Sequence, residues 1–559
     1  MKLATLVLNV LLMLAAVPGY GESMAMIDEG VPSVRIVDLD TGETLLQRKL
    51  PGVPEEILAS ADPARLVLHF QGPGRHNTWG NWFPTGLSSV LLLDSRTLDP
   101  VGTADLGWGR SQLLFRGGSL IALSPGFDSK KPADAKPSTL TAVDLESGKV
   151  VATQEHARYA ESFGIGADGE SLVVFHPSTE RDRKNPSGLL RFVSPSTLED
   201  QKSIQLKGTP TAPVSFEGSD ELYVLRKLDR KTTVMDVVSM SARKVASTLD
   251  LPRDPRILGA DPDTGRLFVA GGAGKETSLL TITGSSIQQT VRIGDRSSLM
   301  ILDETGKRAF IAGTITFSVV DLSSSKSTVT ERIFGKYEEI HEPIALVEAP
   351  ELGRVIALYR SEATGKAFIF DGGTGAKIAD LKTGSAWERW GKVIDAALST
   401  ASSYEAARRS AEADGGGTFF YTVYTPKSER SATRPVVFDG EQKRVFLLDD
   451  ATSDITVMDM KTGERLTDVD VGAAPQQLRA LGDGRLLVIS ERSLMLLDPS
   501  SSKTVTVARL DSPVDQIREL DGRILVATST GLVVIDGEDG EIATAIYDVE
   551  KLGTLTILD

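Results

Sequence analysis

The chain of 559 residues contains no cysteine. Disulfide bonds, thiolate metal sites and covalently attached haem are therefore excluded. Histidine is also rare, and no two of its copies have the close spacing typical of metal ligands: they are His69, His76, His156, His176 and His341. Without cysteine and without a histidine motif, we expect neither a bound metal nor another cofactor.

Basic residues are outnumbered, with 61 Lys and Arg against 76 Asp and Glu, and the formal net charge is −15. Binding of nucleic acid requires a concentrated basic surface that neutralises phosphates. The densest basic run of the sequence, residues 181–184, is interrupted by Asp182. We therefore expect no nucleic-acid partner.

Long apolar runs are missing after the first residues of the chain. Lys2 precedes an apolar stretch from Leu3 to Val17. About fifteen apolar-rich residues fall short of the roughly 20 that span a bilayer. We predict a signal peptide at residues 1–21 and an exported mature protein that begins near Glu22, in the periplasm or outside the cell. An uncleaved N-terminal anchor is the alternative, and no later segment is apolar enough to span a membrane.

One unit recurs along the chain: an apolar strand that ends in Asp, a turn with Gly or Ser, and a second strand. Clear copies occupy residues 34–42, 140–148, 368–375, 455–463 and 532–540. Looser copies bring the total to about eleven. A second type of hairpin, with an Asp/Gly turn before an aliphatic strand, lies between these units, and such turns are strong hairpin signals. Residues 257–270 are one example.

Four short strands in each unit of about 40 residues are typical of β-propeller blades. The paired hairpins resemble YVTN-type β-propeller repeats, relatives of the WD-like propellers, over nearly all of residues 33–559. The resemblance implies an all-β propeller of about eleven four-stranded repeats. It implies little about function, because such propellers serve many unrelated roles.

Eleven repeats exceed the four to eight blades usual for one propeller. We favour two rings, an N-terminal propeller within residues 22–362 and a smaller set of repeats within 363–559. The first ring would close by pairing Ile344–Leu358 with Val34–Leu50. The alternative is a single large ring, closed by pairing Thr554–Ile557 with the N-terminal segment.

Residues 385–413 break the β pattern, because they are rich in Ala and lack alternation. Ser385 and Glu388 fit a capping box, and Trp387 and Trp390 begin a helical spacing of apolar residues. We predict a helical insertion in an otherwise all-β chain.

In a propeller, the connections between second and third strands leave the same face as those between consecutive repeats. The long insertions all belong to these two classes: residues 71–87, 124–138, 177–188 and 382–434. Large aromatic residues are favoured as interface anchors. We predict binding on this face through the five tryptophans, Trp79, Trp82, Trp108, Trp387 and Trp390. The alternative is that these rings only pack the loops onto the propeller.

The sequence contains no convincing catalytic centre. We therefore expect a non-enzymatic binding or scaffold protein that holds a protein, peptide or glycan on the loop-bearing side. The alternative is a propeller-type hydrolase or lyase, similar to a lactonase, with its site at the propeller axis.

Overall fold

The computed structural model describes residues 23–558 with gaps at 61–63, 77–81, 128–134, 166–170, 180–184, 212, 216–218, 274–275, 296, 332, 335–341, 361–364, 384–420, 423–435, 440–443, 450–453, 472–474, 482, 491, 521 and 547–551. The predicted signal peptide and the predicted helical insertion at 385–413 lie outside the described residues. The described residues are mainly β-strands, with a short 3-10 helix, η4 (Pro350–Leu352). In this part of the chain, no helix is long and apolar enough to cross a membrane.

The described strands form eleven antiparallel sheets, which we number as blades from the N-terminus and give from inner to outer strand. Blade 1 contains β48 (Leu552–Leu558), β1 (Ser23–Asp28), β2 (Ser33–Asp38) and β3 (Thr44–Lys49). Blade 2 contains β4 (Glu56–Ser60), β5 (Arg65–Phe70), β8 (Leu87–Asp94) and β9 (Pro100–Trp108). In blade 3 these are β10 (Gln112–Arg116), β11 (Ser119–Ser124), β12 (Ser138–Asp144) and β13 (Val150–His156). Blade 4 has β14 (Ser162–Ile165), β15 (Leu172–His176), β16 (Ser187–Val193) and β17 (Asp200–Lys207).

The inner strand of blade 5 is split into β18 (Thr209–Pro210) and β19 (Val214–Ser215), followed by β20 (Glu221–Lys227), β21 (Thr233–Ser239) and β22 (Lys244–Leu251). Blade 6 has β23 (Arg256–Asp261), β24 (Arg266–Gly271), β25 (Thr277–Thr283) and β26 (Ser286–Gly294). Blade 7 has β27 (Ser297–Leu302), β28 (Arg308–Gly313), β29 (Thr316–Asp321) and β30 (Lys326–Glu331). Blade 8 has β31 (Glu342–Ala349), β32 (Arg354–Arg360), β33 (Gly365–Asp371) and β34 (Lys377–Thr383).

Three blades complete the described ring. Blade 9 has β36 (Val436–Asp439), β37 (Arg444–Asp449), β38 (Asp454–Asp459) and β39 (Arg465–Asp470). Blade 10 has β40 (Pro475–Ala480), β41 (Leu486–Ser490), β42 (Ser493–Asp498) and β43 (Lys503–Arg509). Blade 11 has β44 (Val514–Leu520), β45 (Arg523–Thr528), β46 (Gly531–Asp536) and β47 (Ile542–Ile546). A separate hairpin, β6 (Gly74–His76) with β7 (Trp82–Pro84), lies in the connection between β5 and β8.

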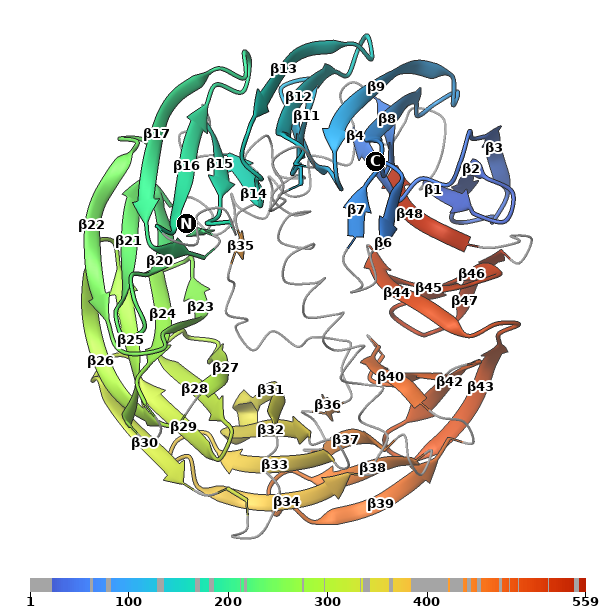
Figure 1. The fold of residues 1–559 in the computed structure, drawn as a ribbon. Helices are drawn as coiled ribbons and strands as arrows, with labels where there is room; N and C mark the ends of the chain where they lie inside the picture. The colour runs from blue at the N-terminus through green and yellow to red at the C-terminus, as the bar shows by residue number, and fades with distance from the viewer. Residues whose placement is uncertain are drawn as a thin grey trace, which may run out of the picture.

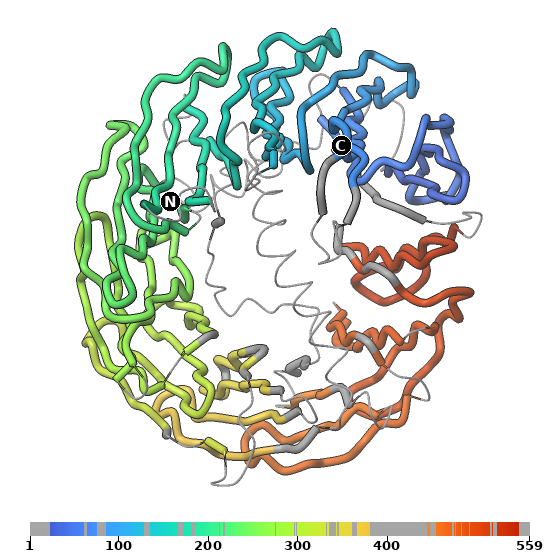
Figure 2. Tube along the Cα trace, in the orientation of Figure 1, coloured from blue at the N-terminus to red at the C-terminus, as the bar shows by residue number. Residues whose placement is uncertain are grey.

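The eleven blades form one closed ring, and the favoured arrangement of two rings is wrong. The C-terminal strand β48 pairs antiparallel with β1, with Leu555 opposite Met26. Figure 1 shows the resulting ring, with β48 beside β1, and in Figure 2 the colour runs once around it from blue to red. The strand pairing proposed to close a smaller ring is absent from the described residues, because β31 and β32 pair within blade 8. The predicted boundary after residue 362 falls between β32 and β33, which are paired strands of one sheet.

Hydrophobic packing between neighbouring blades explains why the ring closes without a break. The described residues form eleven buried clusters, and each joins two adjacent blades. The cluster that joins blade 11 to blade 1 includes Leu525 and Val534 with Met24 and Met26. Each blade is thus buried on both faces, so its middle strands are continuous apolar runs, whereas the outer strands alternate between exposed and buried residues.

The recurring Asp turn joins the third and fourth strands of most blades. In blade 9, the Asp459 carboxylate accepts hydrogen bonds from the amides of Lys461 and Thr462, both at 2.8 Å. The fourth residue after the Asp has a positive φ, as at Gly463 with φ 75°. Glycine adopts this conformation without steric cost. The same position has a non-glycine residue with positive φ in five other blades: Leu98, Leu198, Arg243, Ser325 and Ser502.

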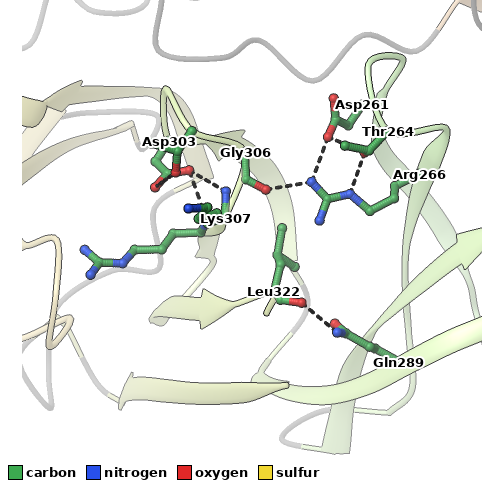
Figure 3. Close-up of polar contacts among 10 residues, drawn as sticks. Asp261, Thr264, Arg266, Gln289, Asp303, Gly306, Lys307 and Leu322 are labelled. Carbon is green, nitrogen blue, oxygen red and sulfur yellow. Dashed lines mark hydrogen bonds and ion pairs between the residues drawn. The ribbon is translucent and has the colours of Figure 1, made fainter. Parts of the chain in front are cut away.

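Arginines at the start of second strands bind the next blade. Arg266, the first residue of β24, bonds to the Asp261 carboxylate at 2.7 Å and to the carbonyl oxygen of Gly306 in blade 7 at 2.6 Å (Figure 3). Arg523 likewise reaches Asp40 at 2.7 Å across the junction where the ring closes. Further bonds of this kind come from Arg65, Arg444 and Arg485. We call these five residues the inter-blade arginines.

Candidate functional site

The two faces of the ring carry connections of very different length. On one face, the turns between first and second strands and between third and fourth strands have two to six residues. The other connections leave the opposite face, as expected from the antiparallel order of each blade. They include the long segments 71–86, 125–137, 177–186, 332–341 and 384–435. We call the two sides the short-turn face and the loop-bearing face.

The base of the first long loop, residues 71–86, is held by a buried serine. The Ser88 hydroxyl accepts a hydrogen bond from the Gly72 amide at 3.1 Å and donates to the carbonyl oxygen of Gly109. The amide of Gly86 also bonds to the carbonyl oxygen of Pro73 at 3.1 Å. These bonds tie the loop to the connection between blades 2 and 3, so its base is preorganised on the loop-bearing face.

Trp108 is the one predicted anchor whose side chain is described. It ends β9, is half-buried, and has the Lys136 ammonium 4.3 Å from its ring centroid. Lys136 belongs to the β11–β12 connection, whose Gly126 amide bonds to the Trp108 carbonyl oxygen at 2.9 Å. In the β8–β9 register, Trp108 lies opposite Leu87, which is 41% exposed. A half-exposed aromatic ring and an exposed leucine therefore stand side by side at this edge.

The other predicted anchors are described less fully. The backbone of Trp82 lies in β7, opposite His76 of β6, and its side chain is not described. Trp79, Trp387 and Trp390 lie outside the described residues.

Three histidines end strands on the loop-bearing face, a clustering that their spacing in the sequence does not reveal. His156 ends β13 and His176 ends β15, yet their ring centroids lie 4.4 Å apart across two blades. The Nδ1 atom of His176 is 3.0 Å from the carbonyl oxygen of Tyr159, so Nδ1 carries the proton in the neutral ring. His69, near the end of β5, is 1% exposed and lies 3.8 Å from a Glu56 carboxylate oxygen.

Burial keeps these imidazoles neutral. Burial, reinforced by Arg110, lowers the pKa of His69 to about 4. Burial also lowers the pKa of His176 to about 3, with His156 as a second cause. The pKa of His156 is lowered by the same desolvation and by Arg191. The three rings thus act as polar core residues at neutral pH. Within the described ranges, no group of three His, Cys, Asp or Glu is placed to hold a metal ion.

A buried carboxylate fixes the loop-bearing end of blade 7. Asp295 accepts hydrogen bonds from the Thr314 hydroxyl at 2.6 Å and the Ile315 amide at 2.9 Å, and also from the Thr316 hydroxyl. These bonds satisfy both carboxylate oxygens. Asp295 therefore orders the β28–β29 turn.

An open cavity of about 290 Å³ lies on the same face, where blades 5, 6 and 7 meet. Its lining includes Arg253 and Asp254 from the connection between blades 5 and 6, Arg256 from the start of β23, and the glycines at 271 and 272. The Gly272 amide bonds to the Arg253 carbonyl oxygen at 2.7 Å. The cavity is thus lined by two guanidinium groups and one carboxylate, and Arg253 pairs with Asp254 at 3.3 Å.

Comparison with known proteins identifies no family. No family model and no curated protein matches the sequence. The chain is similar to a dihydro-haem d1 dehydrogenase, NirN (12% identity, TM-score 0.32, 66% of this chain and 77% of that chain). It is also similar to a eukaryotic initiation factor (8% identity, TM-score 0.29, 65% of this chain and 96% of that chain). A third similar structure is a protein of unknown function from Desulfotomaculum acetoxidans (9% identity, TM-score 0.28, 60% of this chain and 92% of that chain). Likenesses this low carry no argument about the function of this chain.

Proposed function

We propose that this chain is an exported, non-enzymatic scaffold that holds a protein, peptide or glycan on its loop-bearing face. The observation that carries the proposal is the one-sided distribution of long connections on a rigid closed ring. Binding residues are disproportionately found on loops positioned by a rigid scaffold. The short-turn face repeats one local turn, whereas the connections of the other face differ from blade to blade.

The edge formed by Trp108 and Leu87 supports this proposal. Trp108 is only half-buried, and Leu87 beside it is 41% exposed. Aromatic anchors next to apolar neighbours are typical of the energetic centre of an interface. The predicted roles of Trp79, Trp82, Trp387 and Trp390 remain part of the proposal.

Capture of material from the cell envelope of the native host tests the proposal. We expect Trp108→Ala and Leu87→Ala together to reduce capture by immobilised mature protein at least tenfold, as quantified by mass spectrometry. Leu466→Ala is the matched control, because Leu466 is 47% exposed on the outer strand β39. A lower melting temperature with unchanged capture would instead assign Trp108 to packing.

Export is tested separately from binding. N-terminal sequencing of the protein from its native host should find a first residue near Glu22 outside the cytoplasm. An intact Met1 in the cytoplasmic fraction would contradict export without affecting the binding experiment.

A further inference from the structure

We propose that a basic patch around blade 5 binds an acidic polypeptide segment of the partner, an inference that rests on the proposed function. The patch comprises six exposed residues, Lys207, Lys227, Arg230, Lys231, Arg253 and Arg256. They lie on three consecutive connections of the loop-bearing face: the end of β17, the β20–β21 loop, and the link from β22 into β23.

Strand pairing brings the first two connections together. Thr209 pairs with Lys227, and Arg226 bonds to the Lys207 carbonyl oxygen at 2.5 Å. Gly208 permits this approach, because a Cβ atom there would lie 2.6 Å from the carbonyl oxygen of Lys227. Lys207 and Lys227 therefore stand next to each other and not merely in adjacent blades.

The third connection is joined to the second by the outer strands of the same blade. Thr233 pairs with Leu251 in the β21–β22 register. The C-terminal end of the loop that carries Arg230 and Lys231 therefore lies beside the start of the segment that carries Arg253. All six cations border one side of blade 5.

Acidic residues in the patch do not neutralise it. Asp229 accepts hydrogen bonds from the amides of Lys231 and Thr232, at 2.7 and 2.9 Å, so its carboxylate shapes its own loop. Asp254 pairs with Arg253 at 3.3 Å, in a pair that is more than half exposed. Among the described residues, no salt bridge joins Lys207, Lys227, Arg230, Lys231 or Arg256 to an acid. The three connections and the strand residues that border them carry six basic and two acidic residues, in a chain whose net charge is −15.

An apolar residue within the patch favours a polypeptide over an acidic polysaccharide. Leu228 is 43% exposed between Lys227 and Arg230, and an apolar side chain there suits a partner with apolar as well as acidic side chains.

The cavity beside Arg253 and Arg256 gives one acidic side chain a defined place. Both arginines line its volume of about 290 Å³, together with Asp254, the exposed partner of Arg253. Arginine recognises carboxylates through paired N–H donors. We assign the cavity to a Glu or Asp side chain of the partner, with the lysines of the patch facing its neighbours.

Fluorescence anisotropy with the full mature protein tests the inference. The probe is a fluorescein-labelled peptide in which Glu-Glu-Leu-Ser occurs three times, and its neutral counterpart has Gln in place of Glu. We expect Lys227→Glu with Arg253→Glu to weaken binding of the acidic peptide at least tenfold, and added salt to weaken the wild-type complex steeply. The charge-matched control, Lys326→Glu with Lys461→Glu, changes two exposed lysines of the short-turn face and should leave the Kd within twofold.

Equal binding of the Gln peptide, or equal losses in both double variants, would overturn the inference. Binding of polygalacturonate or of duplex DNA, with no binding of the peptide, would overturn it in favour of another class of polyanion. The envelope-capture experiment separates this failure from failure of the proposed function. If changes at Trp108 and Leu87 abolish capture while the patch variants do not, the result supports the scaffold role and contradicts the acidic-peptide site.

Discussion

The short-turn face and the loop-bearing face of this ring differ in how they use polar residues. On the short-turn face, one Asp turn and one arginine position recur from blade to blade, and the arginines bind the next blade. On the loop-bearing face, the described polar groups differ from place to place: the buried Ser88, a histidine pair, the Asp295 carboxylate and the blade-5 patch. The recurring turns and arginines thus help to close the ring, and the irregular groups lie on the face to which we assign binding.

The largest expected effect comes from the core that both faces share. Val457 is 1% exposed between blades 9 and 10. Val457→Asp should lower the free energy of unfolding by about 4 kcal/mol, because it buries an unpaired charge. Denaturant titration measures the loss. Val505→Asp is the control on outer strand β43, where Val505 is 65% exposed, and a similar loss there would contradict the strand phase.

As the pH falls, the stability contributed by the loop-bearing face should be lost at a higher pH than that contributed by the short-turn face. Buried His69 has a pKa near 4 in place of 6.5, so the unfolded chain binds more protons between these values. Its contribution to stability is complete above about pH 6.5 and declines as the pH falls toward 4. The loss is about 3 kcal/mol, because each unit of pKa difference is worth about 1.4 kcal/mol. On the short-turn face, hydrogen bonds from Ser500 and Ser501 hold the pKa of Asp498 at about 2. Its contribution is present above about pH 4 and is lost only as the pH falls toward 2.

Melting curves from pH 7.5 to 2 test this order. His69→Gln should make the decline between pH 6.5 and 4 shallower, with His176 supplying the slope that remains, and should leave the decline below pH 4 unchanged. An unaltered profile in the variant would show that His69 does not govern the first window.

Replacing an arginine by alanine should destabilise the fold more on the short-turn face than on the loop-bearing face. Arg266 bonds to a carboxylate that is 1% exposed and to the next blade. Arg266→Ala should lower the free energy of unfolding by about 2 kcal/mol, because a buried charge-assisted bond is lost. Arg253→Ala on the loop-bearing face should cost less than about 0.5 kcal/mol, since its pair with Asp254 is exposed. Denaturant titration of both variants measures these losses in the free energy of unfolding. Equal losses in the two variants would contradict the proposed difference between the faces.

The smallest expected effect is a gain in stability on the short-turn face. Ser325 and Ser502 have φ of 57° and 54°, at the turn position that glycine occupies in other blades. Replacing either by Gly should raise the free energy of unfolding by about 0.5 to 1 kcal/mol, because the left-handed conformation is strained for residues with a Cβ. Gly463→Ala is the opposite change and should destabilise the fold. A loss of stability in both serine variants would contradict this account of the turn.

The blades were predictable because their signals are local. An Asp followed four residues later by Gly encodes a turn within a few residues, and these turns together with their looser copies predicted about eleven repeats. Leu98 and Arg243 occupy the same turn position with positive φ but lack the glycine that identifies it in sequence. The arginine at the start of second strands also recurs, but its bond to the next blade is visible only in the structure.

Ring number and site composition were not predictable in the same way. Any strand with the blade pattern can pair with the N-terminal strands, so local signals allowed both the favoured pairing of residues 344–358 with 34–50 and the pairing of 554–557 with the N-terminal segment that the structure shows. In the sequence, His156 at the end of β13 and His176 at the end of β15 are separated by β14 and two connections. Their rings meet only because blades 3 and 4 pack together. The blade-5 patch draws cations from residues 207–256, where no single run is dense enough to stand out in an acidic chain.

The sequence by itself determined the all-β class, the repeat length, the approximate number of blades and the side on which long connections lie. These follow from alternation and turn chemistry, which act between residues near one another in the chain. Only the tertiary structure decided that one ring closes through β48 and β1, and which polar groups become neighbours. Those outcomes depend on the angle at which each blade packs on the next, and that angle is set by contacts between residues of different blades.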